Sequence, residues 1–134
     1  MNFNNFTIKS QEAVQQAIQL VQNRGQQAIE AEHLLAGVLK VGENVTNFLF
    51  QKLGLNGLQI SNVLDKQISS LPKVTGGEPY LSRTANEVLQ KAVELSKSLG
   101  DEYVSLEAML LALLNVKSTV ATILKDAGMN EKDL

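Results

Sequence analysis

The sequence has 134 residues, 44% of them hydrophobic, with 12 Lys and Arg against 14 Asp and Glu, no Cys and a single His. This length suits one compact domain, and a net charge of −2 argues against the clustered basic residues that nucleic-acid binding requires. The absence of Cys excludes disulfides, Cys-ligated zinc and cysteine nucleophiles, and one His excludes a multi-histidine metal site.

The first half of the chain predicts four helices. Thr7 is a good N-cap for the first, because its hydroxyl can accept a hydrogen bond from the first turn, and Gly25 is placed to end it. Apolar residues at helical spacing then predict three more helices, at residues 31–40, 45–53 and 58–71.

The segment 72–80 predicts a linker. It holds both prolines of the chain, Pro72 and Pro79, together with Gly76 and Gly77. Proline cannot continue a helix and Gly-Gly is flexible, so we divide the single domain, 1–134, into repeat one (1–71) and repeat two (81–134).

The two halves resemble each other. Residues 7–40 align with 82–115 at a constant offset of 75, and after a one-residue deletion the match resumes at an offset of 74. A tandem duplication explains this, and repeat two then predicts helices at 82–99, 105–114 and 119–127, with a fourth beginning near residue 130. The sequence therefore predicts an all-α fold of two tandem four-helix repeats packed with pseudo-twofold symmetry, the last helix truncated as in an excised fragment.

The chain offers little catalytic chemistry. It has no phosphate-binding glycine loop, zinc-protease motif or nucleophile elbow. His33 follows Glu32 on a predicted helix, where neighbours point about 100° apart and cannot pair, so we expect a structural or surface histidine. We expect a binding domain and not an enzyme.

Three acidic residues allow two interpretations. Glu32 and Glu107 are equivalent in the two repeats, and each lies in the first turn of a predicted helix, where a carboxylate stabilises the positive end of the helix dipole. Alternatively, the pair presents negative charge to a basic ligand. Asp101 adds a third acid in repeat two only, as an exposed loop charge or as part of the same site.

Four apolar residues are candidates for a groove. Val14 and Ile18, with their counterparts Leu89 and Val93, lie towards one edge of a broad apolar arc on the first helix of each repeat. Such edge positions can line a seam between two small cores, which would make a peptide-binding groove. The alternative, that each is an ordinary core residue, is favoured for any one of them.

The ordered motifs resemble the N-terminal domain of Clp-type AAA+ chaperones. In repeat one these are Phe6-Thr7-x-x-x-Gln11-x-Ala13, Ile29-x-x-Glu32-His33-Leu34-Leu35 and Leu53-Gly54-Leu55, and in repeat two they are Leu81-Ser82, Gly100-Asp101, Val104-x-x-Glu107 and Ala127-Gly128. The linker Leu71-Pro72-Lys73-Val74-x-Gly76-Gly77 is most similar to that of ClpB-type disaggregases, and the ClpC-type protease chaperones are the nearest rival.

The resemblance implies an eight-helix domain, monomeric by itself, on a mobile linker to a homohexameric, ATP-driven threading machine in the cytoplasm. The domain would recruit unfolded or aggregated clients during the stress response and pass them to the pore for refolding, with adaptor proteins and a DnaK-type chaperone system as further partners. ATP and Mg would belong to the AAA+ modules of the parent chain, with no cofactor in this fragment, no nucleic acid and no membrane. No apolar run here reaches the length of a membrane span.

The resemblance also assigns residues. Thr7, counted among the substrate-binding candidates, matches the family threonine that opens the first helix. Asp101 and Glu107 match the acidic pair of repeat two that ClpB-type domains use in substrate handling. Glu32 and Glu107 match the paired glutamates that hold phosphorylated arginine in ClpC-type relatives, so the alternative function is an adaptor-docking or phosphoarginine-degron domain of a ClpC/ClpA-type chaperone. The sequence departs from the ClpC pattern at Gln26, Asp101 and Ala108, where histidines would stand, which favours ClpB.

Overall fold

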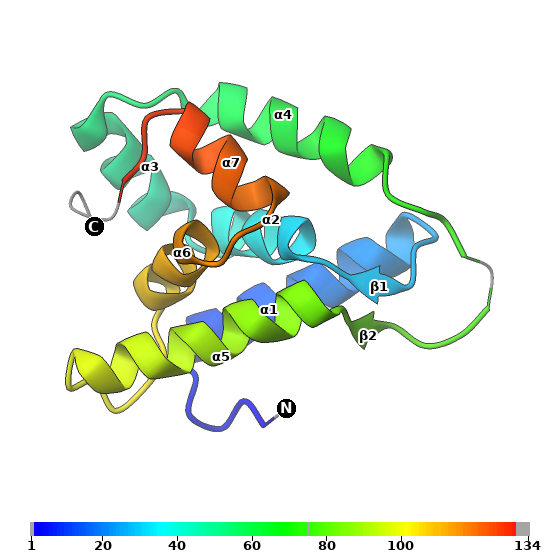
Figure 1. Ribbon diagram of the computed structural model, residues 1–134, viewed down its shortest axis with the longest axis horizontal. Coiled ribbons are helices and arrows are strands. Elements are labelled where there is room, and N and C mark those ends of the chain that lie inside the picture. The colour runs from blue at the N-terminus through cyan, green and yellow to red at the C-terminus, as the bar shows by residue number, and fades with distance from the viewer. Residues whose placement is uncertain (1, 75, 131–134) are drawn as a thin grey trace.

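The computed structural model describes residues 2–74 and 76–130. Within these residues the chain forms seven helices and two short strands (Figure 1), in the order α1 (Ile8–Asn23), β1 (Ala28–Ile29), α2 (Ala31–Val41), α3 (Glu43–Leu53), α4 (Gly57–Ser69), β2 (Tyr80–Leu81), α5 (Arg83–Ser98), α6 (Leu106–Asn115) and α7 (Thr119–Asp126). The all-α fold is confirmed. The fourth helix predicted for repeat two falls mainly outside the described residues.

Hydroxyl side chains begin the main helices of both repeats. Thr7, Ser82 and Ser105 each accept a hydrogen bond at 3.1 Å from the backbone N–H three residues further on. Each bond satisfies one of the N–H groups that a first helical turn leaves without an intrahelical partner. Thr7 and Ser82 are counterparts under the offset of 75, so the duplicated cap is preserved in three dimensions.

Equivalent glycines end α1 and α5. Gly25 and Gly100 have φ of 67° and 78°, a left-handed backbone that costs glycine little. The following N–H groups then turn back, Gln26 N donating to Val21 O at 2.9 Å and Asp101 N to Ser96 O at 2.8 Å. Both helices therefore close with the same Schellman-type turn.

Two short parallel pairings join the repeats. Ile29 pairs with Leu81 in the β1–β2 ladder, and Phe6 pairs with Val104 in an isolated bridge. Adding 75 to Phe6 and Ile29 gives Leu81 and Val104, so exchanging the repeats converts one pairing into the other. Each repeat thus holds the start of the other repeat's first helix, as a pseudo-twofold arrangement requires. These short strands were not predicted from the sequence.

One continuous core fills both repeats. The most apolar helices, α2 and α6, contact each other in the middle of the molecule, with α1 and α5 on one side and α3, α4 and α7 on the other (Figure 1). The buried apolar side chains of both repeats form a single cluster. The expectation of two small cores with a groove between them is therefore wrong, because the facing helices pack directly.

Candidate functional site

The first turn of α1 lies against the turn between α5 and α6. Thr7 N donates to Val104 O at 3.0 Å, and Val104 N donates to Asn5 O at 2.7 Å. Asp101 lies three residues before Val104 and Glu107 three residues after it. The Phe6–Val104 bridge therefore brings Thr7, from the start of repeat one, beside the segment of repeat two that carries both candidate carboxylates.

This region combines exposed apolar and acidic side chains. Ile8, Leu99 and Tyr103 are 75%, 65% and 50% exposed. Asp101 and Glu107 are exposed as well, and their carboxylates have no hydrogen-bond or ion-pair partner among the described residues. We call these five residues, with Thr7, the Thr7 surface.

The hydrogen bonds of Thr7 position the start of α1. Its hydroxyl donates to Ser10 Oγ at 2.9 Å and accepts from Ser10 N, so both hydrogen-bonding functions are occupied within α1. Its own N–H is bonded to Val104 O. Thr7 therefore fixes the start of α1 against the α5–α6 turn, and the side chains of Ile8, Leu99 and Tyr103 nearby are exposed.

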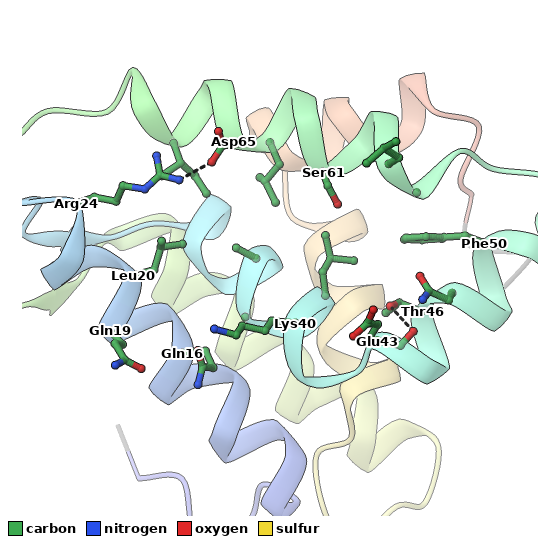
Figure 2. A pocket seen from close by; sticks show the side chains of 18 of the residues that line it. Gln16, Gln19, Leu20, Arg24, Lys40, Glu43, Thr46, Phe50, Ser61 and Asp65 are labelled. Atoms are coloured by element: carbon green, nitrogen blue, oxygen red, sulfur yellow. Dashed lines mark hydrogen bonds and ion pairs between the residues drawn. The ribbon is translucent and has the colours of Figure 1, made fainter.

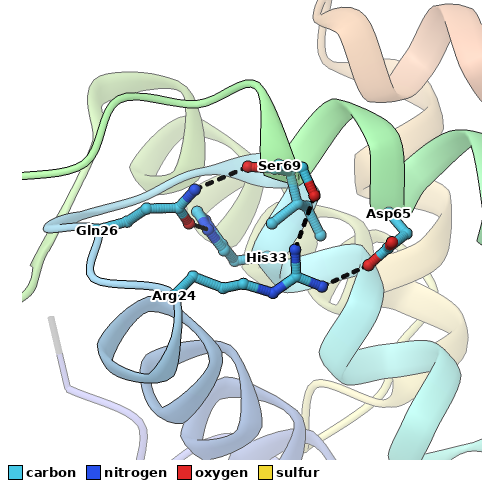
Figure 3. Close-up of polar contacts among 6 residues, drawn as sticks. Arg24, Gln26, His33, Asp65 and Ser69 are labelled. Carbon is cyan, nitrogen blue, oxygen red and sulfur yellow. Dashed lines mark hydrogen bonds and ion pairs between the residues drawn. The ribbon is translucent and has the colours of Figure 1, made fainter.

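The counterpart region of repeat one is covered by α4. Glu32 is 7% exposed, and its carboxylate accepts from Gln67 Nε2 at 3.3 Å. Gln26 is 6% exposed and its amide donates to Ile68 O at 2.7 Å (Figure 3). Glu32 and Glu107 are thus equivalent in sequence but differ in exposure and partners, and only Glu107 is open to solvent.

His33 is a structural residue of this covered region. It is fully buried, its Nδ1 accepts from Glu30 N at 2.9 Å, and its Nε2 lies 2.7 Å from Gln26 Oε1. Because Nδ1 accepts, the proton lies on Nε2, which donates to Gln26. Burial, with a smaller contribution from the Arg24 charge, lowers the pKa of His33 to about 4. His33 therefore stays neutral and caps α2, as its position three residues after Glu30 could have indicated.

Arg24 connects the end of α1 to α4. Its guanidinium donates to Ser69 Oγ at 2.9 Å and forms an ion pair with Asp65, one turn earlier on α4 (Figure 3). With the Gln26–Ile68 bond, these contacts hold the last two turns of α4 over the start of α2. Neither contact was foreseen, since the partners are more than 40 residues apart in sequence.

The predicted groove residues are mostly core. Val14 and Leu89 are 3% and 0% exposed, so they offer no surface that could line a groove, and Ile18 and Val93 are half-buried against the same core. The alternative of ordinary core packing describes Val14 and Leu89. An apolar arc on one helix does not tell which of its edges a neighbouring helix will cover.

A cleft of about 670 Å³ lies within repeat one, bounded by α1, α2, α3 and α4 (Figure 2). Apolar side chains such as Leu20 and Phe50 line it, with Gln16 and Gln19 on the α1 side and the Arg24–Asp65 ion pair between α1 and α4. None of the predicted site residues lines this cleft. In the sequence, only the polar residues of α1, such as Gln16 and Gln19, could have indicated this cleft. The same polar residues are equally consistent with a helix face exposed to solvent.

The described residues hold neither a metal-binding cluster nor a single membrane-spanning helix. No group of three or more His, Asp or Glu side chains in residues 2–74 and 76–130 could hold a metal ion. No single described helix is long and apolar enough to cross a membrane, and the strongly bent pair α6 and α7 passes that test only by length and composition.

Comparisons with known proteins agree on one family. Residues 5–127 match the Clp repeat (R) N-terminal domain. The chain is 76% identical to the chaperone protein ClpB of Bacteroides thetaiotaomicron over 134 residues, which are 100% of this chain and 16% of that protein. Its fold matches the Hsp104 N-terminal domain from Candida albicans with a TM-score of 0.85, at 22% identity over 97% of this chain and 86% of that chain. A complex of the ClpV N-domain with a VipB peptide matches with a TM-score of 0.77, at 22% identity over 98% and 83% of the two chains.

Proposed function

The chain belongs to the Clp repeat N-terminal domain family, and from that membership we propose that it recruits unfolded or aggregated polypeptide for a ClpB-type, ATP-dependent disaggregase. The chain is a Clp N-terminal domain and not an ATPase module. It would therefore bind clients and deliver them to a threading ring, and the chemical work would be done elsewhere in the protein.

The observation that carries this proposal is the composition of the Thr7 surface. Ile8, Leu99 and Tyr103 are at least half exposed, and unfolded clients differ from folded proteins in exposing apolar side chains. Contacts between the two sets would remove apolar area from water, which is the main driving force for such binding. Asp101 and Glu107 can accept hydrogen bonds from client N–H groups and attract basic side chains.

A related domain supports peptide recognition as a use of this fold. The ClpV N-domain binds a VipB peptide in the structural relative described above. At 22% identity that likeness concerns the fold alone, so the residues that would bind a client here are argued from this chain's own surface.

The remaining expectations concern the whole protein. The chain spans 16% of the length of the Bacteroides ClpB protein, so hexamer formation, ATP and Mg binding, cooperation with a DnaK-type system and a cytoplasmic role in stress response and refolding are part of the proposal. The proposal also includes a monomeric state of the domain and its division into repeats 1–71 and 81–134 by the linker 72–80.

The phosphoarginine alternative fits this chain less well. It needs two accessible glutamates, whereas Glu32 is 7% exposed and bonded to Gln67. Of the predicted pair, Glu107 alone remains open to a charged ligand.

The test is a titration of the domain into a fluorescein-labelled synthetic peptide rich in Leu, Phe and Arg, followed by fluorescence anisotropy. We expect Leu99→Asp with Tyr103→Asp to weaken binding by at least about tenfold, equivalent to about 1.4 kcal/mol. The matched control is Leu58→Asp on α4, a leucine 72% exposed and far in sequence from the Thr7 surface. Equal weakening by the control, or wild-type affinity in the double variant, would contradict the proposal.

A further inference from the structure

The dipeptide that begins α4 is chemically labile. Asn56 is followed by Gly57, and no other asparagine of the sequence precedes a glycine. The Gly57 nitrogen can attack Cγ of Asn56, and glycine has no side chain to hinder the approach. The new N–Cγ bond closes a cyclic succinimide as the Cγ–Nδ2 bond breaks, and the amide proton of Gly57 leaves with the NH₂ group as ammonia.

Water then opens the ring in one of two directions. Adding water at Cγ breaks the N–Cγ bond and leaves aspartate in an ordinary main chain. Adding water at the main-chain carbonyl carbon breaks its bond to the Gly57 nitrogen and leaves isoaspartate, in which the main chain runs through Cβ and Cγ. The isoaspartate main chain is one carbon longer, and the former main-chain carbonyl becomes a free carboxylate.

The fold has a use for both residues of this pair. Asn56 is the N-cap of α4, since its Oδ1 accepts from Gln59 N at 3.1 Å and its main-chain O accepts from Ile60 N at 3.2 Å. Gly57 lies against the ring of Phe50, where an added Cβ would stand 2.9 Å from Cδ2. Capping therefore favours the asparagine and packing favours the glycine, which keeps the labile pair together at an exposed helix start.

The same helix start holds the reacting atoms apart. Asn56 has a ψ of 96°, which places the Gly57 nitrogen on the opposite side of the Cα–C bond from Cβ. Ring closure requires the nitrogen and Cγ on the same side, so the Cα–C bond must rotate. This rotation breaks the hydrogen bonds from Gln59 and Ile60 to Asn56. Attack must therefore wait for a local opening of the first turn of α4.

We propose that Asn56–Gly57 is a site of spontaneous deamidation that the first turn of α4 protects, and that the isoaspartate product keeps this turn from re-forming. The longer main chain cannot both accept the bonds from Gln59 and Ile60 and keep Gly57 against Phe50. Phe50 and Gly57 line the α1–α4 cleft of repeat one, so the product also alters that cleft (Figure 2). The aspartate product preserves the turn, because aspartate caps helices as well as asparagine does. This chemistry is independent of client recruitment.

Peptide mapping by mass spectrometry, after incubation at mildly alkaline pH, tests the site on the unmodified chain. Asn56 should be the first asparagine converted, and its conversion should be at least about tenfold slower in the folded chain than in urea. Earlier conversion of another asparagine in urea, or equal rates at Asn56 in the folded and unfolded chains, would overturn the proposal.

Gln59→Glu tests the protection without touching the reacting atoms. A glutamate at this third helical position can accept from Asn56 N and complete a capping box, so conversion of Asn56 should slow in the folded chain and stay unchanged in urea. The matched control is Gln90→Glu, an exposed position on α5, which should convert Asn56 at the wild-type rate. A wild-type rate in the folded Gln59→Glu chain would contradict protection by the first turn.

Hydrogen–deuterium exchange tests the effect of the isoaspartate product. The chain carrying isoaspartate at position 56, purified after incubation, should exchange the amides of Gln59 and Ile60 faster than the variant Asn56→Asp, which copies the other product. Equal protection of these amides in the two chains would show that the turn re-forms, against the proposal.

Discussion

Mild acid should destabilise this domain through His33. The imidazole is fully buried and neutral, with Nδ1 accepting from Glu30 N and Nε2 donating to Gln26. A second proton would have to lie on Nδ1, facing the Glu30 N–H that now donates to it. Burial, with a smaller contribution from the Arg24 charge, lowers the pKa of His33 from 6.5 to about 4, so folding opposes its protonation.

The sign and size of the effect follow from linkage. As the pH falls below about 6.5, the unfolded chain binds the His33 proton before the folded chain does, so the free energy of unfolding decreases. Between about pH 7 and pH 5 the loss should be about 2 kcal/mol, and it should approach about 3 kcal/mol as the pH falls through the folded-state pKa.

Urea unfolding followed by circular dichroism at several pH values measures this loss. His33 is the one histidine of the chain, and ordinary carboxylates titrate near pH 4. The loss of stability between about pH 7 and pH 5.5 therefore reports on His33. The control is His33→Ala, which copies the residue at the equivalent position, Ala108. This variant should be less stable at neutral pH and should have a nearly flat profile between about pH 7 and pH 5.5. A wild-type profile that is flat there, or the same slope in the variant, would show that burial of His33 does not make stability depend on pH.

Three further substitutions should change the free energy of urea unfolding. Gly37→Ala should lower it by about 2 kcal/mol, because a Cβ at Gly37 would lie 2.1 Å from Ala13 O where α2 crosses α1; an unchanged value would mean that the helices separate easily. Ser96→Ala should raise it by about 1 kcal/mol, because the buried Ser96 hydroxyl has no hydrogen-bond partner in the described structure and repeat one has Val21 there; a loss of stability would indicate a missed partner. Thr7→Ala should lower it by about 1 kcal/mol through the lost N-cap, and a neutral result would show that the Val104 bridge alone holds the helix start.

The helices and the duplication could be predicted because their determinants are local. Thr7 and Ser82 act as caps and Gly25 and Gly100 as helix ends through atoms a few residues away, so sequence spacing specifies them. The observed helix bounds agree with the predicted ones to within two residues.

The strand pairings and the covered glutamate could not be predicted, because they depend on long-range packing. A bridge such as Phe6 to Val104 involves too few residues to produce an alternating pattern. The burial of Glu32 was not predictable from its neighbours in the sequence, since its carboxylate is covered by Gln67, which lies 35 residues away on α4. The sequence left a structural and a surface role open for His33, and the structure shows the structural one, because its partner Gln26 is reached through the turn that follows α1.

The most direct test of client recruitment by the Thr7 surface is amide chemical-shift mapping of the labelled domain during titration with the Leu-, Phe- and Arg-rich peptide. The proposed function predicts shifts concentrated at the start of α1, residues 6–10, and at residues 99–107, with little change at Glu32 or along α4. Shifts confined to the α1–α4 cleft of repeat one, or no shifts at saturating peptide, would contradict it.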